Sequence, residues 1–141
     1  MTEVGVDVET NQIPRRSGRH LSQVALVWAD GRNPYVTPVK IPGASLEDLL
    51  EIEPRLPYSA EEHFHAPPPS QVNNVVKAAI CGHDILDFNV EYDSMFLPFL
   101  NERDHRGRRV FNVQDVMLRA APYVKEWNPF FAAYEYPSLK L

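Results

Sequence analysis

Three carboxylates in this sequence have spacings that would let them act together. Asp7 and Glu9 lie two residues apart in a stretch, residues 3–9, in which valines alternate with other residues. This alternation is typical of a β-strand, on which residues two apart point to the same face. Asp93 lies in the first turn of a predicted helix, just after a short predicted strand at residues 85–88. Carboxylates that converge in this way could bind a divalent metal ion.

Each of these acids also has a simpler explanation. The odd-numbered side of the 3–9 strand could face water, which alone would account for Asp7 and Glu9. A carboxylate in the first turn of a helix is stabilised by the helix dipole by about 0.3–1 kcal/mol, which alone would account for Asp93. The presence of a third carboxylate in a suitable place favours a metal site over separate surface features.

The elements that must position these acids predict a mixed α/β sheet. Residues 3–9, 21–29 and 35–41 have the patterns of three strands, and we expect them to form an antiparallel meander with the Asp7 strand central. Pro38 places the third strand at an edge. The second half alternates helices with short strands, which predicts parallel strands and helices on the sheet faces. Further expected elements are a capped turn at Ser45, an irregular segment 54–69, a helix 70–80 capped by Ser70, the strand 85–88, a helix 90–102 capped by Asn89 and interrupted at Pro98, a strand 110–111 and a helix 113–123.

Composition and charge limit the class of protein. With 141 residues, 44% of them hydrophobic and 23% charged, the chain is suited to one globular domain. A net charge of −5 argues against a protein that coats nucleic acid non-specifically, but an enzyme whose site holds metal ions is compatible with it. There is no apolar run long enough to cross a membrane, and no signal-peptide pattern. The single cysteine, Cys81, excludes an internal disulfide, so we expect a cytoplasmic protein with no membrane partner.

Other side chains could bind ligands, although each group has an ordinary explanation. One candidate zinc set has one-residue spacings that are unusual for structural zinc: His63, His65, Cys81 and His83. Two basic loops could contact phosphates or simply be solvated: Arg15, Arg16 and Arg19, and Arg103, His105, Arg106, Arg108 and Arg109. Late aromatic residues could stack on bases but are better explained as cover for the sheet: Trp127, Phe130, Phe131, Tyr134 and Tyr136.

Two segments together resemble an enzyme family. Asp7-Val8-Glu9-Thr10 is similar to the first motif of the DEDD 3′–5′ exonucleases, the superfamily that includes RNase T and proofreading nucleases. Residues 88–97, Phe-Asn-Val-Glu-Tyr-Asp-Ser-Met-Phe-Leu, resemble its second motif, Asn-x-x-aromatic-Asp-x-x-x-Leu. Shorter similarities occur in family order at residues 22–27, 58–62, 66–68, 114–118 and 136–139. The resemblance therefore runs along the whole chain.

This resemblance implies an RNase H-like fold, a mixed sheet with flanking helices. It also implies hydrolysis of phosphodiester bonds at the 3′ end of DNA or RNA, with two Mg²⁺ or Mn²⁺ ions about 3.5–4 Å apart. Matched by position, Asp7, Glu9 and Asp93 would be the catalytic metal ligands. Thr10 would contribute to the pocket for the terminal nucleotide and Asn89 would lie at its rim. Asp115 matches an aspartate that is structural in the family.

The sequence departs from the family in two places. Asn11-Gln12 stand where the family often has Thr-Gly, and no aspartate has a histidine five residues or a tyrosine four residues before it, as the third motif requires. We therefore expect residues 1–141 to be an exonuclease-like domain that is incomplete at its C-terminus: an N-terminal portion, a degenerate copy, or half of a split enzyme completed by a second chain. Such a chain would have weak activity, and bare apolar surface around Phe130, Phe131 and Leu141 would favour self-association.

Two alternatives remain open on the sequence. One is a non-catalytic nucleic-acid-binding or interaction module on the same fold. The other is an RNase H-like phosphoryl-transfer domain of a different subtype, because its sheet and acidic strand are similar. Activity with Mg²⁺ on an oligonucleotide with a free 3′ end would separate the enzyme from the binding module.

Overall fold

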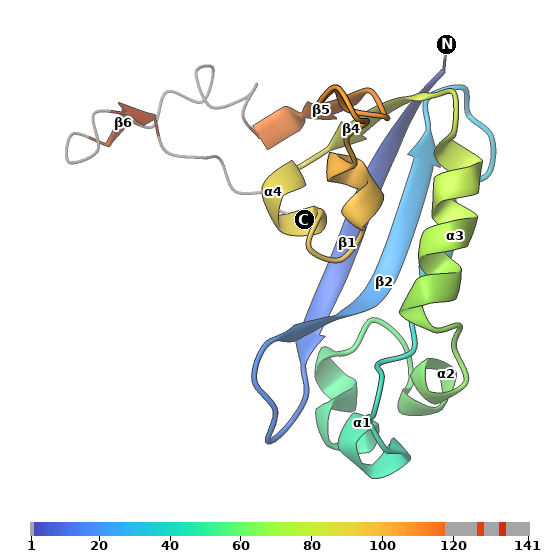
Figure 1. Ribbon diagram of the computed structural model, residues 1–141. Helices are drawn as coiled ribbons and strands as arrows, with labels where there is room; N and C mark the ends of the chain where they lie inside the picture. The colour runs from blue at the N-terminus through green and yellow to red at the C-terminus, as the bar shows by residue number, and fades with distance from the viewer. Residues whose placement is uncertain (1, 118–126, 129–132, 135–141) are drawn as a thin grey trace.

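A five-stranded mixed sheet organises the protein in a computed structural model, which describes residues 2–117, 127–128 and 133–134 (Figure 1). The strand order is β3-β2-β1-β4-β5. The first three strands pair antiparallel, whereas β4 and β5 run parallel to β1. The strands are β1 (Glu3–Gln12), β2 (Arg19–Trp28), β3 (Tyr35–Pro38), β4 (Asp84–Asp87) and β5 (Val113–Asp115). The predictions of a mixed sheet, a central Asp7 strand and an edge strand containing Pro38 are confirmed.

The alternation in β1 separates a core face from a polar face. Val4 and Val6 are buried, whereas Asp7 and Glu9 are exposed. The apolar core on the valine face includes residues of β2, β4 and β5, and one stripe of helix α3 (Pro69–Ile80), which contributes Val72, Val76 and Ile80. Burying a side chain of this size stabilises a fold by about 1.5–3 kcal/mol. The valines therefore fix which way the two acids point.

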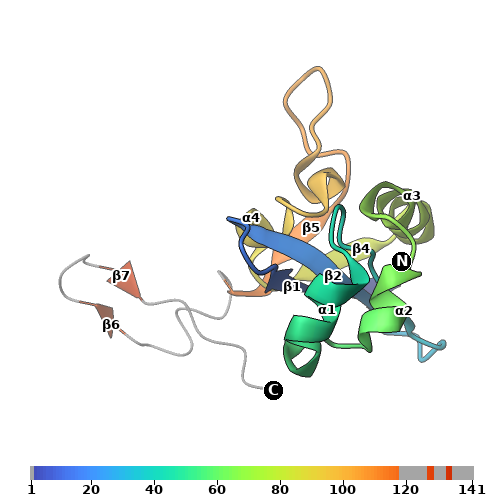
Figure 2. The same ribbon diagram turned by 90° about the horizontal axis from the view of Figure 1, so that it is seen from below.

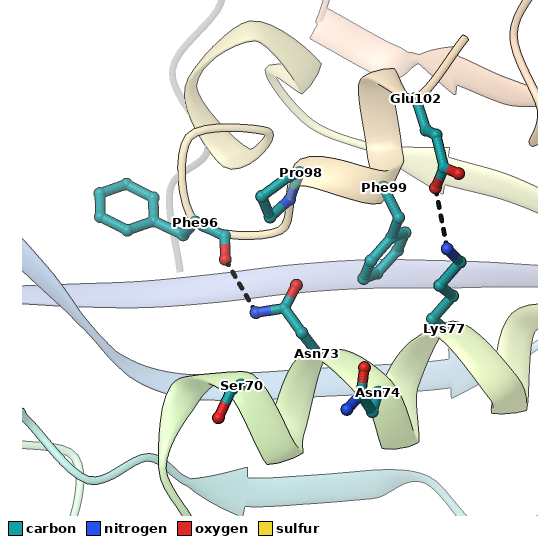
Figure 3. Close-up of a pocket in the computed structure, with 8 residues that line it drawn as sticks. All are labelled: Ser70, Asn73, Asn74, Lys77, Phe96, Pro98, Phe99 and Glu102. Atoms are coloured by element: carbon teal, nitrogen blue, oxygen red, sulfur yellow. Dashed lines mark hydrogen bonds and ion pairs between the residues drawn. The ribbon is translucent and has the colours of Figure 1, made fainter. Parts of the chain in front are cut away.

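Two short helices pack on the same face as α3. They are α4 (Val90–Asp93) and the 3₁₀ helix η2 (Pro98–Asn101), which contribute Val90, Phe99 and Leu100 to the core. Asn73 of α3 donates to the carbonyl of Phe96 at 3.2 Å, and Lys77 pairs with Glu102 at 3.0 Å (Figure 3). These polar contacts join α3 to the chain on both sides of η2.

A second, smaller core lies beside the far end of β1. It consists of Ile13, Ile41, Ala44, Leu49, Ile52, Leu56 and Ala60. The helices here are α1 (Leu46–Ile52), the 3₁₀ helix η1 (Glu53–Arg55) and α2 (Ala60–Phe64), which lie together away from α4 in Figures 1 and 2. The prediction that residues 54–69 are irregular is therefore wrong in part, because helix α2 occupies the middle of this segment. Ser59 caps α2 by accepting from the Glu62 N–H at 3.1 Å, a signal that the surrounding prolines obscured.

The second half of the chain differs from the prediction in several bounds. Helix α3 begins at Pro69 with Pro68 at its N-cap, so the predicted cap at Ser70 is wrong. A proline is accommodated at the first position because this position needs no N–H donor. The helix after Asn89 ends at Asp93, and Pro98 begins η2, so the predicted interruption at Pro98 is confirmed. The fifth strand is β5, three residues later than expected, where a helix had been predicted to begin.

Two short antiparallel strands, β6 (Trp127–Asn128) and β7 (Ala133–Tyr134), pair with each other. The expected helix beyond residue 117 and the apolar residues Phe130, Phe131 and Leu141 lie outside the described residues. Among the residues that the structure does describe, no helix has the length and apolar character needed to span a membrane.

Replacing Ser45 by alanine should test the packing of the α1 end. The Ser45 Oγ accepts from the Asp48 N–H at 3.1 Å, and Asp48 Oδ2 accepts from the Ser45 N–H at 3.1 Å, which is a reciprocal capping box. Ser45→Ala should lower the free energy of unfolding by about 1 kcal/mol. Urea denaturation measures it, with Ser17→Ala in the exposed β1–β2 loop as the matched control. Equal stability of the two variants would contradict the prediction.

Candidate functional site

The strand register places Asp7 just beyond the carboxyl end of β4. Strand β4 pairs with β1 only from Glu3↔Asp84 to Val6↔Asp87, whereas β2 accompanies β1 as far as Gln12. The chain leaving β4 turns into α4 beside this part of β1. In open α/β sheets, ligand sites form outside the carboxyl ends of strands where the strand order reverses. The acids of β1 therefore lie where such a site is expected.

Hydrogen bonds hold α4 against the end of β1. The Thr10 hydroxyl and the Tyr92 hydroxyl are 2.7 Å apart, and the Arg19 guanidinium donates to Thr10 Oγ1 at 2.7 Å and also to the Thr10 carbonyl. Thr10 is 8% exposed, so these bonds replace water around its hydroxyl. The three side chains come from β1, β2 and α4 and connect the elements that carry the acids.

A β-bulge shapes the strand end. The β1–β2 register shifts between Glu9 and Thr10, so that Ser22 of β2 is the additional residue. The Ser22 hydroxyl lies 3.1 Å from the Glu9 carbonyl and 2.6 Å from Asn11 Oδ1. A bulge bends the strand and increases its twist, which changes the direction of nearby side chains. Here it does so immediately after Glu9.

Asn89 and Asp115 fix the start of α4. Asn89 has a left-handed backbone, φ 72°, and its side-chain oxygen accepts from the Tyr92 N–H at 3.3 Å, which confirms its predicted capping role. Asp115, at the end of β5, accepts from the Asn89 and Val90 N–H groups at 3.3 and 2.9 Å. This use of Asp115 agrees with the structural role that the resemblance implied. A place for Asn89 at the rim of a nucleotide pocket stays a prediction.

The acids act on one another electrostatically. Asp93 is 5% exposed, and burial raises the pKa of its carboxyl. A hydrogen bond from Asp87 opposes this rise, whereas the charges of Asp7, Asp115 and Glu9 increase the pKa of Asp93 further. Partial desolvation also raises the pKa of Asp7. The fold thus concentrates negative charge between the end of β1 and α4.

Asp87 is the site residue that sequence reasoning missed. It is the last residue of β4 and is 1% exposed, and no donor among the described residues bonds either carboxylate oxygen. Burial, the hydrogen bond with Asp93 and the nearby charges raise the pKa of Asp87 far above its usual range. Burial and the neighbouring carboxylates therefore favour the protonated form of Asp87. The only signal in the sequence was an acid directly after the apolar pair Ile85-Leu86 of the strand.

The oxygen ligands at this place suit a hard divalent cation. Carboxylates whose charges repel one another gain from a cation between them, and Mg²⁺ and Mn²⁺ prefer such oxygens. Within the described part of the chain, no three His, Cys, Asp or Glu side chains are already arranged around one ion position. Asp7, Glu9 and Asp93 thus have suitable chemistry for a metal, and their role as ligands stays a prediction.

Solved structures of exonuclease I from E. coli have this fold. The complex with a dT13 oligonucleotide aligns with a TM-score of 0.56 at 16% identity, over 90% of this chain and 31% of that one. The dA16 complex gives 0.56 at 14% identity, over 96% and 33%. A zinc-bound complex with ssDNA gives 0.55 at 14%, over 95% and 33%. No family model and no curated protein matches the sequence.

The likeness to exonuclease I confirms the fold that the two motifs implied. The chain has an RNase H-like fold, with the sheet order 3-2-1-4-5 and flanking helices. The chain spans about a third of the length of the exonuclease I chains that it resembles in fold.

Replacing Asp87 by asparagine should stabilise the protein at neutral pH. Because the pKa of Asp87 is raised in the folded state, its contribution to stability is fully present below the unfolded pKa, near 4, and is lost as pH rises toward the folded pKa. Each pH unit in that window costs about 1.4 kcal/mol. An amide carries no such cost, so Asp87→Asn should gain about 2–4 kcal/mol of unfolding free energy at pH 7.5 and much less at pH 4.5.

Urea denaturation at both pH values measures this difference. Glu61→Gln, on the exposed surface of α2, removes one carboxylate far from the acids and serves as the control. A pH-independent effect of Asp87→Asn, or a loss of stability at pH 7.5, would contradict a protonated Asp87.

Proposed function

We propose that this chain is a metal-dependent 3′–5′ exonuclease domain that acts on the 3′ end of DNA or RNA. The observation that carries the proposal is the electrostatic coupling of Asp7 and Glu9 of β1 with Asp93 of α4, at the carboxyl end of β4. The likeness of the fold to exonuclease I, whose structures include oligonucleotide complexes, supports the same function. The two motifs found in the sequence support it independently.

In this proposal Asp7, Glu9 and Asp93 hold two Mg²⁺ or Mn²⁺ ions. When bound, such ions lower the pKa of a water nucleophile and stabilise the leaving 3′-oxygen. Thr10, fixed by Tyr92 and Arg19, positions the strand end next to the terminal nucleotide. Asn89 holds the first turn of α4, and with it Asp93, in place.

Manganese binding tests the ligand assignment without depending on catalysis. Titration calorimetry at pH 7.5 should show Mn²⁺ binding that weakens at least tenfold in Asp7→Asn, because one anionic ligand is lost. Glu47→Gln, an exposed acid in the first turn of α1, is the matched control and should bind as the parent chain does. Absence of Mn²⁺ binding in the parent chain would contradict the proposed function.

Turnover by this chain alone should be low. The sequence contains neither His-x-x-x-x-Asp nor Tyr-x-x-x-Asp, so no residue is assigned to orient the attacking water or to supply a fourth carboxylate. Loss of a general base alone typically lowers the rate by about 10²–10⁴-fold. Release of nucleotides from a 3′-labelled oligonucleotide with Mg²⁺ or Mn²⁺ measures the rate. Rapid release that disappears in Asp7→Ala would show that the missing groups are supplied from elsewhere.

One observation favours a second candidate, a non-catalytic nucleic-acid-binding module. Burial raises the pKa of both Asp87 and Asp93, and no three metal-binding side chains in the described ranges surround one point. Such a module would bind an oligonucleotide equally well with EDTA and with Mn²⁺, and calorimetry would detect no Mn²⁺ binding. The same two measurements therefore separate the candidates.

A further inference from the structure

A short basic segment stands out from an acidic chain. Residues 102–110, here called the basic arm, connect η2 to the region before β5 and contain four arginines and His105 between positions 103 and 109. The whole chain carries a net charge of −5. Figure 2 shows the orange loop of the basic arm extending away from the sheet. A concentrated positive charge on such a protein requires an explanation.

The backbone of the basic arm is held in one shape by its own hydrogen bonds. Asp104 and Arg108 are joined by an N–H···O bond of 2.8 Å, and Val110 donates to the Glu102 carbonyl at 2.9 Å. The Asp104 carboxylate accepts the N–H groups of Arg106 and Arg108 at 2.8 and 3.0 Å. Gly107 makes the turn with φ +77°, which other residues adopt only with strain. The arm is therefore preorganised.

The base of the basic arm is attached to the body of the protein. Glu102 pairs with Lys77 of α3 at 3.0 Å (Figure 3), which leaves the charge of Glu102 compensated. Arg109 donates to the carbonyl of Val113, the first residue of β5, at 3.3 Å. These contacts fix the direction of the arm relative to the sheet.

Two guanidinium groups of the basic arm point to no protein partner. The Arg103 guanidinium donates to the Gly107 carbonyl at 2.8 Å, and the Arg109 guanidinium donates to the Val113 carbonyl. No described residue forms a hydrogen bond or ion pair with the guanidinium group of Arg106 or of Arg108, and both residues are exposed. The Asp104 carboxylate accepts backbone N–H groups, so it is not paired with either guanidinium. The free charge of the arm is thus available to a ligand.

The basic arm adjoins the helix that carries Asp93. A cavity of about 300 Å³ lies between its base and the start of α4. The cavity is lined by Val90, Glu91, Ser94, Asn101, Arg109 and Asp115. Arg109, at the base of the arm, therefore faces the same cavity as the first turn of the helix that carries Asp93.

We propose that the basic arm binds the phosphodiester backbone of the nucleic-acid strand whose 3′ end enters the acidic site; this inference rests on the proposed function. A net negative protein with grouped carboxylates repels a polyanion. Arginines on a preorganised loop offset this repulsion locally and steer the strand toward the site. Arginine suits the role because its planar donors match phosphate oxygens.

The composition of the basic arm favours a phosphate backbone over a protein partner. Interfaces with proteins are built around buried apolar or aromatic anchors. Positions 103–109 contain no apolar side chain, only arginines, Asp104, His105 and Gly107. Backbone contacts of this kind give affinity without sequence preference.

Fluorescence anisotropy with labelled oligo-dT and oligo-U in EDTA tests the proposal apart from catalysis. The full chain should bind both, and Arg106→Gln with Arg108→Gln should weaken binding about tenfold at 0.1 M salt. The slope of log K against log salt should fall by about 1.4, since each contact to a single strand contributes about 0.7. The effect should be equal for DNA and RNA, because phosphate is common to both.

A double variant on the α1–α2 side provides the control. Lys40→Gln with Arg55→Gln changes the net charge equally at two exposed positions and should bind like the parent chain. Any of four results would overturn the proposal. These are equal weakening in both double variants, no oligonucleotide binding by the parent chain, an effect confined to DNA or to RNA, and displacement of the oligonucleotide by polyglutamate that is as effective as displacement by unlabelled oligonucleotide. Mn²⁺ binding should be unchanged in the arm variant, so failure of the arm and failure of the metal site are distinguishable.

Discussion

The short pairing of β4 with β1 is the constraint on which the rest of the structure depends. Because β4 accompanies β1 for only four residue pairs and ends opposite Val6, the backbone of β1 continues past it with Asp7 and Glu9. The chain from β4 must then turn, and Asn89 makes the turn in a left-handed conformation that starts α4. A longer β4 would cover this part of β1 and carry Asp93 away from it. The place of the acids is thus a property of the register.

Concentrating carboxylates costs free energy that the surrounding packing must offset. Asp87 and Asp93 are both buried, and this burial raises the pKa of both carboxyls, which disfavours two charges at this place. The valines of β1 and the stripe of α3 supply the stability that allows this arrangement. Sites that bind cations commonly have this character, since the charge that destabilises the empty protein is what attracts the ion.

Local patterns predicted those features that local chemistry determines. The alternating valines of β1, the edge position of Pro38 and the cap at Asn89 each depend on a few neighbouring residues, and the structure agrees with all three. The end of the helix after Asn89 could not be placed, because apolar residues continue past Asp93 while the backbone turns to reach η2.

Features that depend on pairing between distant segments could not be predicted from local sequence patterns. The pair Val110-Phe111 is as strand-like in composition as the residues of β5, so composition could not choose between them. Only the pairing of Val113 with Ile85 sets the position of β5. Asp87 lies beside the acids only because the pairing of β4 with β1 ends at this residue, opposite Val6. The bulge at Ser22 likewise follows from how β1 and β2 meet, and no residue type marks it in advance.

In the loop around Asp104, the residues that determine the backbone shape differ from the residues that carry the unpaired charge. The bonds within this loop are made by backbone groups and by the side chains of Asp104 and Arg103, so the side chains at positions 106 and 108 take no part in holding it. Substitutions there alter the electrostatic surface while leaving the conformation intact. The charge of this surface can therefore change by single substitutions that remove no bond within the loop.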